Sequence, residues 1–263
     1  MTRSVLVTVT GSLERLFGWI LVLSLACLAV AYFLKDRLPD PDGYDLDQLV
    51  EPRQRPTRSR PFTTEVNGED YVIEPKFEYE LNGVIVSYHD ADSFSDIWHH
   101  DRWRDFLNLR DLCVIWGENV ASGVYLDMSF RNDSWTCWFS WPDAATGRRF
   151  DAQEISNNHL LADSDEVKQA LMSAEPGDHI WLKGVLASYR NSSNRFFRGT
   201  SVTRSDTGNG ACETIYVDEL RVVAKANPRM RKLYEIAKWS ALVSLIGFVI
   251  MFALAPVRRS RYA

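Results

Sequence analysis

The stretch Leu16–Leu34 reads LFGWILVLSLACLAVAYFL and holds no charged residue. As a helix that rises 1.5 Å per residue, it would span about 28 Å, close to the thickness of the hydrocarbon core of a bilayer. The stretch Trp239–Val257, WSALVSLIGFVIMFALAPV, has the same length and is also uncharged. Both stretches predict transmembrane helices rather than buried core helices. A cleaved signal peptide is the alternative for the first, but the apolar run continues through Tyr32–Leu34, past the small residues Ala29–Ala31.

The two apolar stretches enclose one large domain. Half of the ten prolines fall within residues 39–61, which predicts an extended linker that acts as a spacer or, alternatively, as an arm for a partner or anionic lipid. Asn227-Pro228 predicts the start of a helix that we expect to continue to Leu254. The expected order is an N-terminal tail at 1–15, the first transmembrane helix at 16–34, a linker at 35–61, the extramembrane domain at 62–226, a juxtamembrane helix at 227–238, the second transmembrane helix at 239–257 and a basic tail at 258–263.

The middle of the chain is expected to be rich in strands. Its patterning predicts strands at 71–74, 77–89, 112–116, 124–130, 135–141, 179–189, 196–203 and 214–223, and helices at 92–109 and 164–174. Gly177–Leu186, GDHIWLKGVL, is typical of small barrels such as OB-folds, because a glycine turn launches a strand and a second glycine lets it coil. We therefore expect an α+β membrane protein, with two transmembrane helices flanking a β-rich domain that is a curved sheet or an OB-like barrel with helical insertions.

Charge is distributed unevenly along the chain. The net charge is −5, and because residues 1–34 carry +1 and residues 239–263 carry +3, residues 35–238 hold −9. An acidic domain repels phosphate backbones, so we expect no nucleic-acid partner. The expected partners are the lipid bilayer and a protein, either a different one or a second copy of this chain.

The domain has three cysteines, Cys113, Cys137 and Cys212, while Cys27 lies in the first membrane segment. In an oxidising compartment two of the three can pair. Cys113 with Cys137 is the first choice for a disulfide, because both lie in expected strands that can be neighbours. Three buried thiols are the alternative. The sequence has no C-x-x-C pair, so we expect no structural zinc site.

Two polar stretches are candidate binding segments: ISNNHLL at Ile155–Leu161 and TRSDTGNGACE at Thr203–Glu213. A loop rich in Asp, Asn and Gly can bind a cation or cradle a ligand through backbone groups, although this one lacks the carboxylate ladder of an EF-hand. A wide surface turn is the alternative interpretation. The candidate ligand-binding residues are Asn158, His159, Arg204, Asp206, Asn209 and Glu213.

The sequence contains no complete catalytic or metal motif. His99 and His100 are adjacent and would point to different faces of a helix, and no H-x-x-x-H or H-E-x-x-H spacing occurs. A pair such as Cys212 with His159 is available by residue type alone. We therefore assign no catalytic residue, no metal and no cofactor.

Five stretches of the domain are distinctive: DLCVIWGENV, SWTCWF, ISNNHLL, GDHIWLKGVLASY and RSDTGNGACETIYVDEL. Together they resemble a group of uncharacterised bacterial membrane-anchored proteins, over roughly residues 62–224. The resemblance implies a bacterial inner-membrane setting. It implies no activity and carries over no functional residue.

Basic residues near the membrane segments bear on orientation. The compact Arg258–Arg261 tail is typical of a cytoplasmic stop, whereas a raw count of both flanks slightly favours a cytoplasmic domain. A long acidic domain can be translocated regardless of its charge. We therefore expect a multi-pass protein of the bacterial inner membrane, with its domain in the periplasm and both termini in the cytoplasm.

Two functions remain for the domain. We favour a non-enzymatic envelope protein that binds a partner protein or scaffolds a membrane complex, since spans without ionisable residues argue against a transporter. The alternative is an envelope hydrolase or ligand-binding module with its site near Ser156–His159 and Thr203–Glu213. A pocket where these stretches converge, with a perturbed pKa at His159 or Cys212, would favour the alternative. A flat apolar patch, or an unpaired helix face on residues 229–238, would favour the scaffold.

Overall fold

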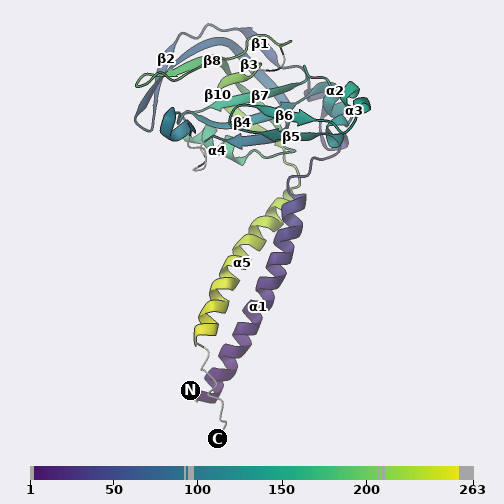
Figure 1. Ribbon diagram of the computed structural model, residues 1–263, viewed down its shortest axis with the longest axis vertical. Coiled ribbons are helices and arrows are strands. Elements are labelled where there is room, and N and C mark those ends of the chain that lie inside the picture. The colour runs from purple at the N-terminus through teal and green to yellow at the C-terminus, as the bar shows by residue number, and fades with distance from the viewer. Residues whose placement is uncertain (1–2, 92, 94–97, 207, 209–210, 255–263) are drawn as a thin grey trace. The chain divides into compact units, whose positions relative to one another are not determined.

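The computed structural model describes residues 3–91, 93, 98–206, 208 and 211–254. The chain divides into two compact units (Figure 1). One unit is formed by the two ends of the chain, up to Arg37 and from Asn227, and it contains the two long helices. The other unit is Leu38–Ala226, which contains every strand found among the described residues.

Helices α1 (Arg3–Leu34) and α5 (Pro228–Leu254) form the first unit. Thr10–Leu34 and all of α5 are long and apolar enough to cross a membrane. Large apolar side chains on both helices stay exposed, for example Phe33 at 78% and Phe252 at 65%. Apolar surface of this extent is stable where lipid covers it. Helix α5 begins at Pro228, the position at which the sequence predicts a helix start, because proline suits the first helical position.

Small residues lie between α1 and α5, which are side by side within their unit. The Ser24 hydroxyl donates to the Ser240 hydroxyl at 2.8 Å. A Cβ atom on Gly247 would lie only 2.7 Å from Cε1 of Phe17, so glycine permits this close approach. Small side chains and hydroxyl pairs of this kind stabilise helix contacts in apolar surroundings. The two apolar segments therefore pack as a pair.

The second unit is built around one eight-stranded sheet. Five strands pair in a closed cycle: β3 (Glu69–Asp90), β4 (Asn108–Ile115), β7 (Ile155–Leu161), β10 (Glu213–Ala224) and β8 (His179–Asn191), which pairs back with β3. The β7–β10 pair is parallel, and the other pairs of the cycle are antiparallel. Strands β1 (Arg53–Pro56) and β2 (Phe62–Val66) pair with β3, and β9 (Phe197–Arg198) pairs with β8. The fold is therefore α+β with a large mixed sheet.

Shorter elements connect these strands. A separate hairpin of β5 (Ser129–Asn132) and β6 (Cys137–Ser140) lies between β4 and β7 in the chain. Helix α4 (Asp165–Ser173) follows β7, and the Ser164 hydroxyl caps it by accepting from the amide of Val167. The remaining helical turns are η1 (Pro41–Gly43), η2 (Leu46–Gln48), the π-helix η3 (Trp98–Arg102), α2 (Gly117–Ala121), η4 (Val124–Asp127) and α3 (Ala144–Arg149).

Two apolar clusters fill the domain. The larger includes Leu81, Ile85, Leu112, Leu160 and Ile215, and the smaller includes Tyr71, Ile73, Leu107 and Tyr189. Strands β8 and β10 approach closely at Gly184, where a Cβ atom would collide with the carbonyl oxygen of Tyr216. Gly184 is the second glycine of GDHIWLKGVL, and glycine is required here because only glycine tolerates this backbone approach.

The helix expected at 92–109 is wrong for residues 103–109, although Trp98–Arg102 form a helical turn. Within 98–109 the π-helix η3 ends at Arg102 and β4 begins at Asn108, while residues 92 and 94–97 lie outside the described residues. Arg104 has a φ of 49°, in the left-handed region that ends a helix. The Tyr71 hydroxyl accepts from the amide of Phe106 and donates to the carbonyl of Arg104. Contacts with a distant strand therefore replace the helical hydrogen bonds.

The structure also differs from the sequence expectation at 38–61 and 124–130. Strand β1 pairs with β3, and Leu49 is only 2% exposed, so this proline-rich segment packs onto the domain instead of running free. The Tyr125 hydroxyl donates to the carbonyl of Pro39. Tyr125 itself is fully buried in the turn η4, which replaces the first half of the strand expected at 124–130.

Candidate functional site

A cleft with a volume of about 1170 Å³ opens where the two polar stretches meet. Its walls come from the β5–β6 hairpin, strand β7, the segment 194–206 and the start of β10. Ligand sites of proteins commonly measure about 300–1,000 Å³, so this cleft can hold a small molecule of several rings.

The parallel pairing of β7 and β10 creates one wall of the cleft. Thr214 lies opposite His159, and Glu213 lies opposite Asn158. The cleft is lined here by Asn157 and His159 of β7, by Glu213 and Thr214 of β10, and by Cys212 just before β10.

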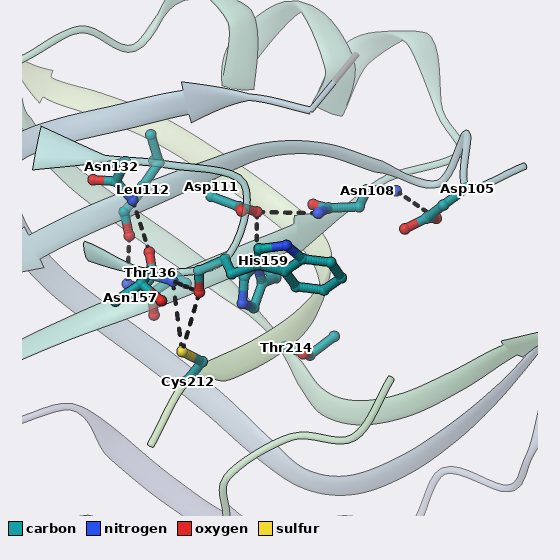
Figure 2. Close-up of polar contacts among 12 residues, drawn as sticks. Asp105, Asn108, Asp111, Leu112, Asn132, Thr136, Asn157, His159, Cys212 and Thr214 are labelled. Carbon is teal, nitrogen blue, oxygen red and sulfur yellow. Dashed lines mark hydrogen bonds and ion pairs between the residues drawn. The ribbon is translucent and has the colours of Figure 1, made fainter. Parts of the chain in front are cut away.

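His159 is oriented by a buried carboxylate from the neighbouring strand β4. Its Nδ1 lies 2.7 Å from Oδ1 of Asp111, which is fully buried (Figure 2). Asn108 donates from Nδ2 to the same Asp111 oxygen at 3.1 Å. The amide of Asn108 donates in turn to Asp105. A chain of buried polar groups therefore holds His159 in place at the wall of the cleft.

The protonation of this pair follows from its surroundings. Burial lowers the pKa of His159, and the attraction of Asp111 offsets this only in part. Burial would raise the pKa of Asp111, but His159 and Arg198 hold that pKa below its ordinary value. The arrangement is therefore a buried Asp111 carboxylate whose Oδ1 lies 2.7 Å from Nδ1 of a His159 that burial favours in its neutral form. With the proton on Nδ1, the lone pair on Nε2 of such an imidazole is available as a base.

Arg198 is an unusual cation in the cleft wall. The residue is only 8% exposed, and neither Nη1 nor Nη2 has a hydrogen-bond partner among the residues that the structure describes. Its guanidinium lies 4.7 Å from the ring centroid of Trp135. Burying a charge without hydrogen bonds costs free energy.

The cleft wall is rich in arginine and aromatic rings. Four arginines line it, namely Arg102, Arg195, Arg198 and Arg204, against the acidic side chains Asp206 and Glu213. Trp103 lies 4.5 Å from Trp135, centroid to centroid, and stacks on Phe196 at 5.8 Å. Trp138 and Phe197 are 51% and 63% exposed. The cleft therefore offers positive charge and flat apolar surfaces within a domain that is acidic as a whole.

Arg204 and Glu213 form a second buried pair at the edge of the cleft. Arg204 Nη1 donates to Oε1 of Glu213. The guanidinium also lies 5.7 Å from the Tyr79 ring and 5.4 Å from the Trp116 ring, both in the larger apolar cluster. Burial raises the pKa of Glu213 to about 7, although Arg204 opposes the shift. This pair therefore faces the core as much as the cleft.

The structure places the residues proposed from the sequence in different positions. His159, Arg204, Asp206 and Glu213 all line the cleft. Asn158 points to the opposite face of β7, where its amide donates to the carbonyl of Leu112 at 3.1 Å and to the Ser156 hydroxyl at 2.8 Å. Asn158 therefore stabilises the sheet. Asn209 lies outside the described residues.

Sequence reasoning missed Asp111, Arg198 and the aromatic wall. Asp111 belongs to the apolar-looking stretch DLCVIW, and Arg198 follows two phenylalanines in a segment expected to be a strand. One signal was available: SWTCWFSW places three tryptophans within seven residues, and all three are about half exposed. Exposed tryptophan is uncommon enough to suggest a binding surface.

Cysteines lie near both strands that pair with β7: Cys113 in β4 and Cys212 just before β10. A disulfide joins Cys113 of β4 to Cys137 of β6, the pair that the sequence puts first. Cys212 is half-buried and outside any disulfide. Asn157 donates from Nδ2 to the Cys212 sulfur at 3.5 Å and to the carbonyl of Trp135 at 3.1 Å. Burial raises the pKa of the Cys212 thiol. No cluster of three or more metal-ligating His, Cys, Asp or Glu side chains occurs in the described ranges.

Comparison with known proteins assigns no family. A scan against protein-family models, a search of curated proteins and a search of solved structures found no match. The chemistry of the cleft is therefore the basis for function: a buried cation whose Nη atoms have no acceptor among the described residues, an imidazole beside a buried carboxylate, and a thiol in the same cleft.

Proposed function

We propose that the domain is a ligand-binding module whose cleft takes an anionic ligand. The observation that carries this proposal is Arg198, a nearly buried guanidinium without a hydrogen-bond acceptor among the described residues. A carboxylate or phosphate group accepts two parallel hydrogen bonds from a guanidinium, and such charge-assisted bonds are about twice as strong as neutral ones. Binding an anion would therefore give the Arg198 guanidinium the hydrogen-bond acceptors whose absence makes its burial unfavourable.

The aromatic wall indicates what surrounds the anionic group of the ligand. Trp135 is 45% exposed and already lies against Arg198, and Trp138 presents a further open ring. Flat aromatic faces offer large contact area to another ring at little entropic cost. We expect a ligand that combines a carboxylate or phosphate with a ring, such as an acidic sugar.

We infer that the domain is an OB-like barrel, and this inference supports the position of the site. The five-strand cycle of β3, β4, β7, β10 and β8 supports the barrel. OB-folds bind oligosaccharides and oligonucleotides on their second and third strands and the loops between strands 1–2 and 4–5. In the chain order of this cycle, the second and third strands are β4 and β7. Trp103 lies between β3 and β4, and Arg198 lies between β8 and β10. The analogy concerns location, and the ligand is argued from the residues.

The scaffold function is the second candidate, and one observation favours it. Trp141, just beyond β6, is 48% exposed and is not part of the cleft wall. Exposed tryptophans are enriched at protein interfaces. Affinity purification of the full chain from membranes in mild detergent, compared with the Trp141→Ala variant, tests it. A stoichiometric partner that the variant loses supports the scaffold, and the absence of any stoichiometric partner contradicts it.

We propose that the protein is a multi-pass protein of the bacterial inner membrane, with a periplasmic domain and cytoplasmic termini. The Cys113–Cys137 disulfide supports this side of the membrane, because disulfides persist in oxidising compartments and are rare in the cytosol. Cys212 is the natural reporter. A membrane-impermeant maleimide should label it in spheroplasts of a Cys27→Ser strain, and labelling only after lysis would place the domain in the cytoplasm.

A matched pair of sugars tests anion binding. 4-Nitrophenyl glucuronide and 4-nitrophenyl glucoside differ only in a carboxylate, and quenching of tryptophan fluorescence in the full-length protein in detergent reports their binding. We expect the glucuronide to bind at least about 10-fold more tightly, because a charge-assisted hydrogen bond contributes about 1.5–3 kcal/mol. Arg198→Gln should remove this preference, whereas Arg190→Gln, an exposed arginine outside the cleft wall, should retain it. Equal affinity of the two sugars for the unmodified protein would contradict the proposal.

A further inference from the structure

Cys212 is a thiol in the cleft that pairs with no other cysteine. All four cysteines of the chain are among the described residues, and Cys113 and Cys137 are joined to each other. Asn157 contacts the Cys212 sulfur, and the sulfur lies 3.7 Å from the carbonyl of Trp135. These contacts point the thiol along the cleft wall rather than into the core.

His159 lines the same cleft as this thiol. Thr214 is directly opposite His159 in the parallel register, and Cys212 precedes Thr214 by two residues. Diagonal neighbours on one face of a strand pair are within reach of ring side chains. Figure 2 shows Asp111 on one side of the His159 ring and Cys212 with Thr214 on the other.

The Thr214 hydroxyl is engaged in a hydrogen bond, so Cys212 is the better candidate nucleophile of the two. The Thr214 hydroxyl donates to the carbonyl of Gly199 at 2.8 Å. The Cys212 thiol has only long contacts, and burial keeps it in the protonated form at neutral pH. A thiol of this kind needs a base to become nucleophilic. An imidazole with Nδ1 held by a buried carboxylate supplies such a base.

Arg198 is an observation independent of the sulfur that also indicates a ligand at this place. Arg198 and Cys212 line the same cleft and both lie against Trp135: the guanidinium is 4.7 Å from its ring centroid, and the Cys212 sulfur is 3.7 Å from its carbonyl oxygen. A ligand held by its anionic group on Arg198 would present its neighbouring atoms to Cys212.

We propose that Cys212 is an acyl-accepting nucleophile for anionic acyl esters, with His159 as its base and Asp111 as the residue that positions His159. This inference rests on the proposed anion-binding function of the same cleft. It names the substrate class as an ester whose acyl group carries a carboxylate or phosphate.

The chemistry needs only the ester and water. Nε2 of His159 takes the thiol proton as the sulfur forms a bond to the acyl carbon, and the carbonyl electron pair moves to oxygen. Collapse of this intermediate breaks the C–O bond, and the leaving alkoxide takes the proton from His159. Water then attacks the thioester, with His159 again taking the proton. The acyl group leaves as a carboxylic acid and the thiol is restored.

Alkylation by iodoacetamide tests whether His159 activates Cys212. The full-length protein with Cys27→Ser in detergent has Cys212 as its one free thiol. We expect His159→Gln to lower the rate constant for alkylation about 100-fold at neutral pH, since a general base contributes about 10²–10⁴ in rate. His179→Gln removes a buried histidine outside the cleft wall and should leave the rate unchanged. Equal rates in the two variants would overturn the assignment of the base.

Acylation by a matched pair of esters tests the nucleophile and needs no variant to fold. 4-Nitrophenyl hydrogen adipate carries a carboxylate on a six-carbon acyl chain, and 4-nitrophenyl hexanoate is its neutral counterpart. We expect a burst of nitrophenolate from the adipate ester and a mass gain of one adipoyl group on the peptide that contains Cys212. Cys212→Ser should abolish the burst. Asp111→Asn should lower the acylation rate constant while KM stays within about twofold, because Asp111 acts through His159.

The two proposals fail in different ways. Preferred glucuronide binding without acylation of Cys212 would overturn the nucleophile and leave the anion-binding function standing. Acylation at the same rate by the adipate and hexanoate esters would overturn the anion-binding function and leave the nucleophile standing. Arg198→Gln should slow only the adipate ester.

Discussion

Two pairs of ionisable side chains involve strands β7 and β10, and they differ in what surrounds them. The Arg204–Glu213 pair lies against the core rings of Tyr79 and Trp116. The Asp111–His159 pair lies at the wall of the cleft. Both carboxyls are almost fully buried.

The two carboxyls nevertheless have pKa shifts in opposite directions. Burial raises the pKa of Glu213 to about 7 in spite of Arg204, whereas the contact with His159 holds the pKa of Asp111 below its ordinary range. Each carboxyl accepts on one oxygen, Asp111 from Asn108 and Glu213 from Arg204, and the other oxygen of each has no partner among the described residues. The pKa of Asp111 is lowered because His159 and Arg198 together outweigh its burial, whereas Arg204 offsets the burial of Glu213 only in part. Asp111 contacts His159 of the cleft wall, and Glu213 lines the cleft itself.

The largest expected effect is on the core face of β4. Leu112 is fully buried in the larger apolar cluster and follows Asp111 directly in sequence. Leu112→Ala should lower the free energy of unfolding by about 4 kcal/mol, because it removes apolar burial and leaves a cavity. Urea unfolding of the full-length protein in detergent measures it. The glucuronide affinity of the folded protein should stay within about twofold, and a parallel loss of affinity would show that the two faces are not independent.

Removal of the disulfide should have the next largest effect. Cys113→Ala with Cys137→Ala opens a link that spans 24 residues and ties β6 to β4. We expect a loss of about 3.5 kcal/mol from the free energy of unfolding, since the link restricts the unfolded chain. Cys27→Ala is the matched control and should change the same measurement by less than about 0.5 kcal/mol. A double variant as stable as the parent would contradict the expectation.

The raised pKa of Glu213 makes the core-side pair sensitive to pH. The folded protein binds the Glu213 proton more tightly than the unfolded chain between the ordinary value of 4.5 and about 7. Its contribution to stability is therefore full below pH 4.5 and is lost as pH rises to 7, by roughly 3 kcal/mol. Glu213→Gln should flatten the unfolding free energy over this range, relative to the partly exposed control Glu219→Gln. An unchanged slope would mean that Glu213 is ionised throughout.

The smallest expected effect on stability is at the open edge of the cleft. Trp138 is 51% exposed, and its indole donates to Asp133 at 2.6 Å. Trp138→Ala should change the free energy of unfolding by less than about 1 kcal/mol. It should weaken glucuronide binding about fivefold, since aromatic ring contacts contribute about 0.5–1.5 kcal/mol. A large loss of stability with unchanged binding would reverse this assignment.

Much of the fold is visible in local patterns. The two uncharged runs predict α1 and α5 because helix length and hydropathy depend on neighbouring residues alone. Asn227-Pro228 marks the start of α5, and the alternation after Gly177 marks β8. The helix predicted at 92–109 does not continue beyond Arg102, because distant residues decide the structure there. Its helical pattern is overridden by the Tyr71 hydroxyl, which lies far away in sequence.

The candidate site shows the same division. The sequence by itself determined two apolar helices, a β-rich domain between them and two polar stretches rich in ligand-forming side chains. Only the tertiary structure decided that these stretches lie side by side through the β7–β10 pairing, that Asp111 lies against His159, and that the Nη atoms of Arg198 are buried with no acceptor in the described part of the chain. The physical reason is that burial and pairing partners come from strands distant in sequence, and they set which side chains are charged and which face the cleft.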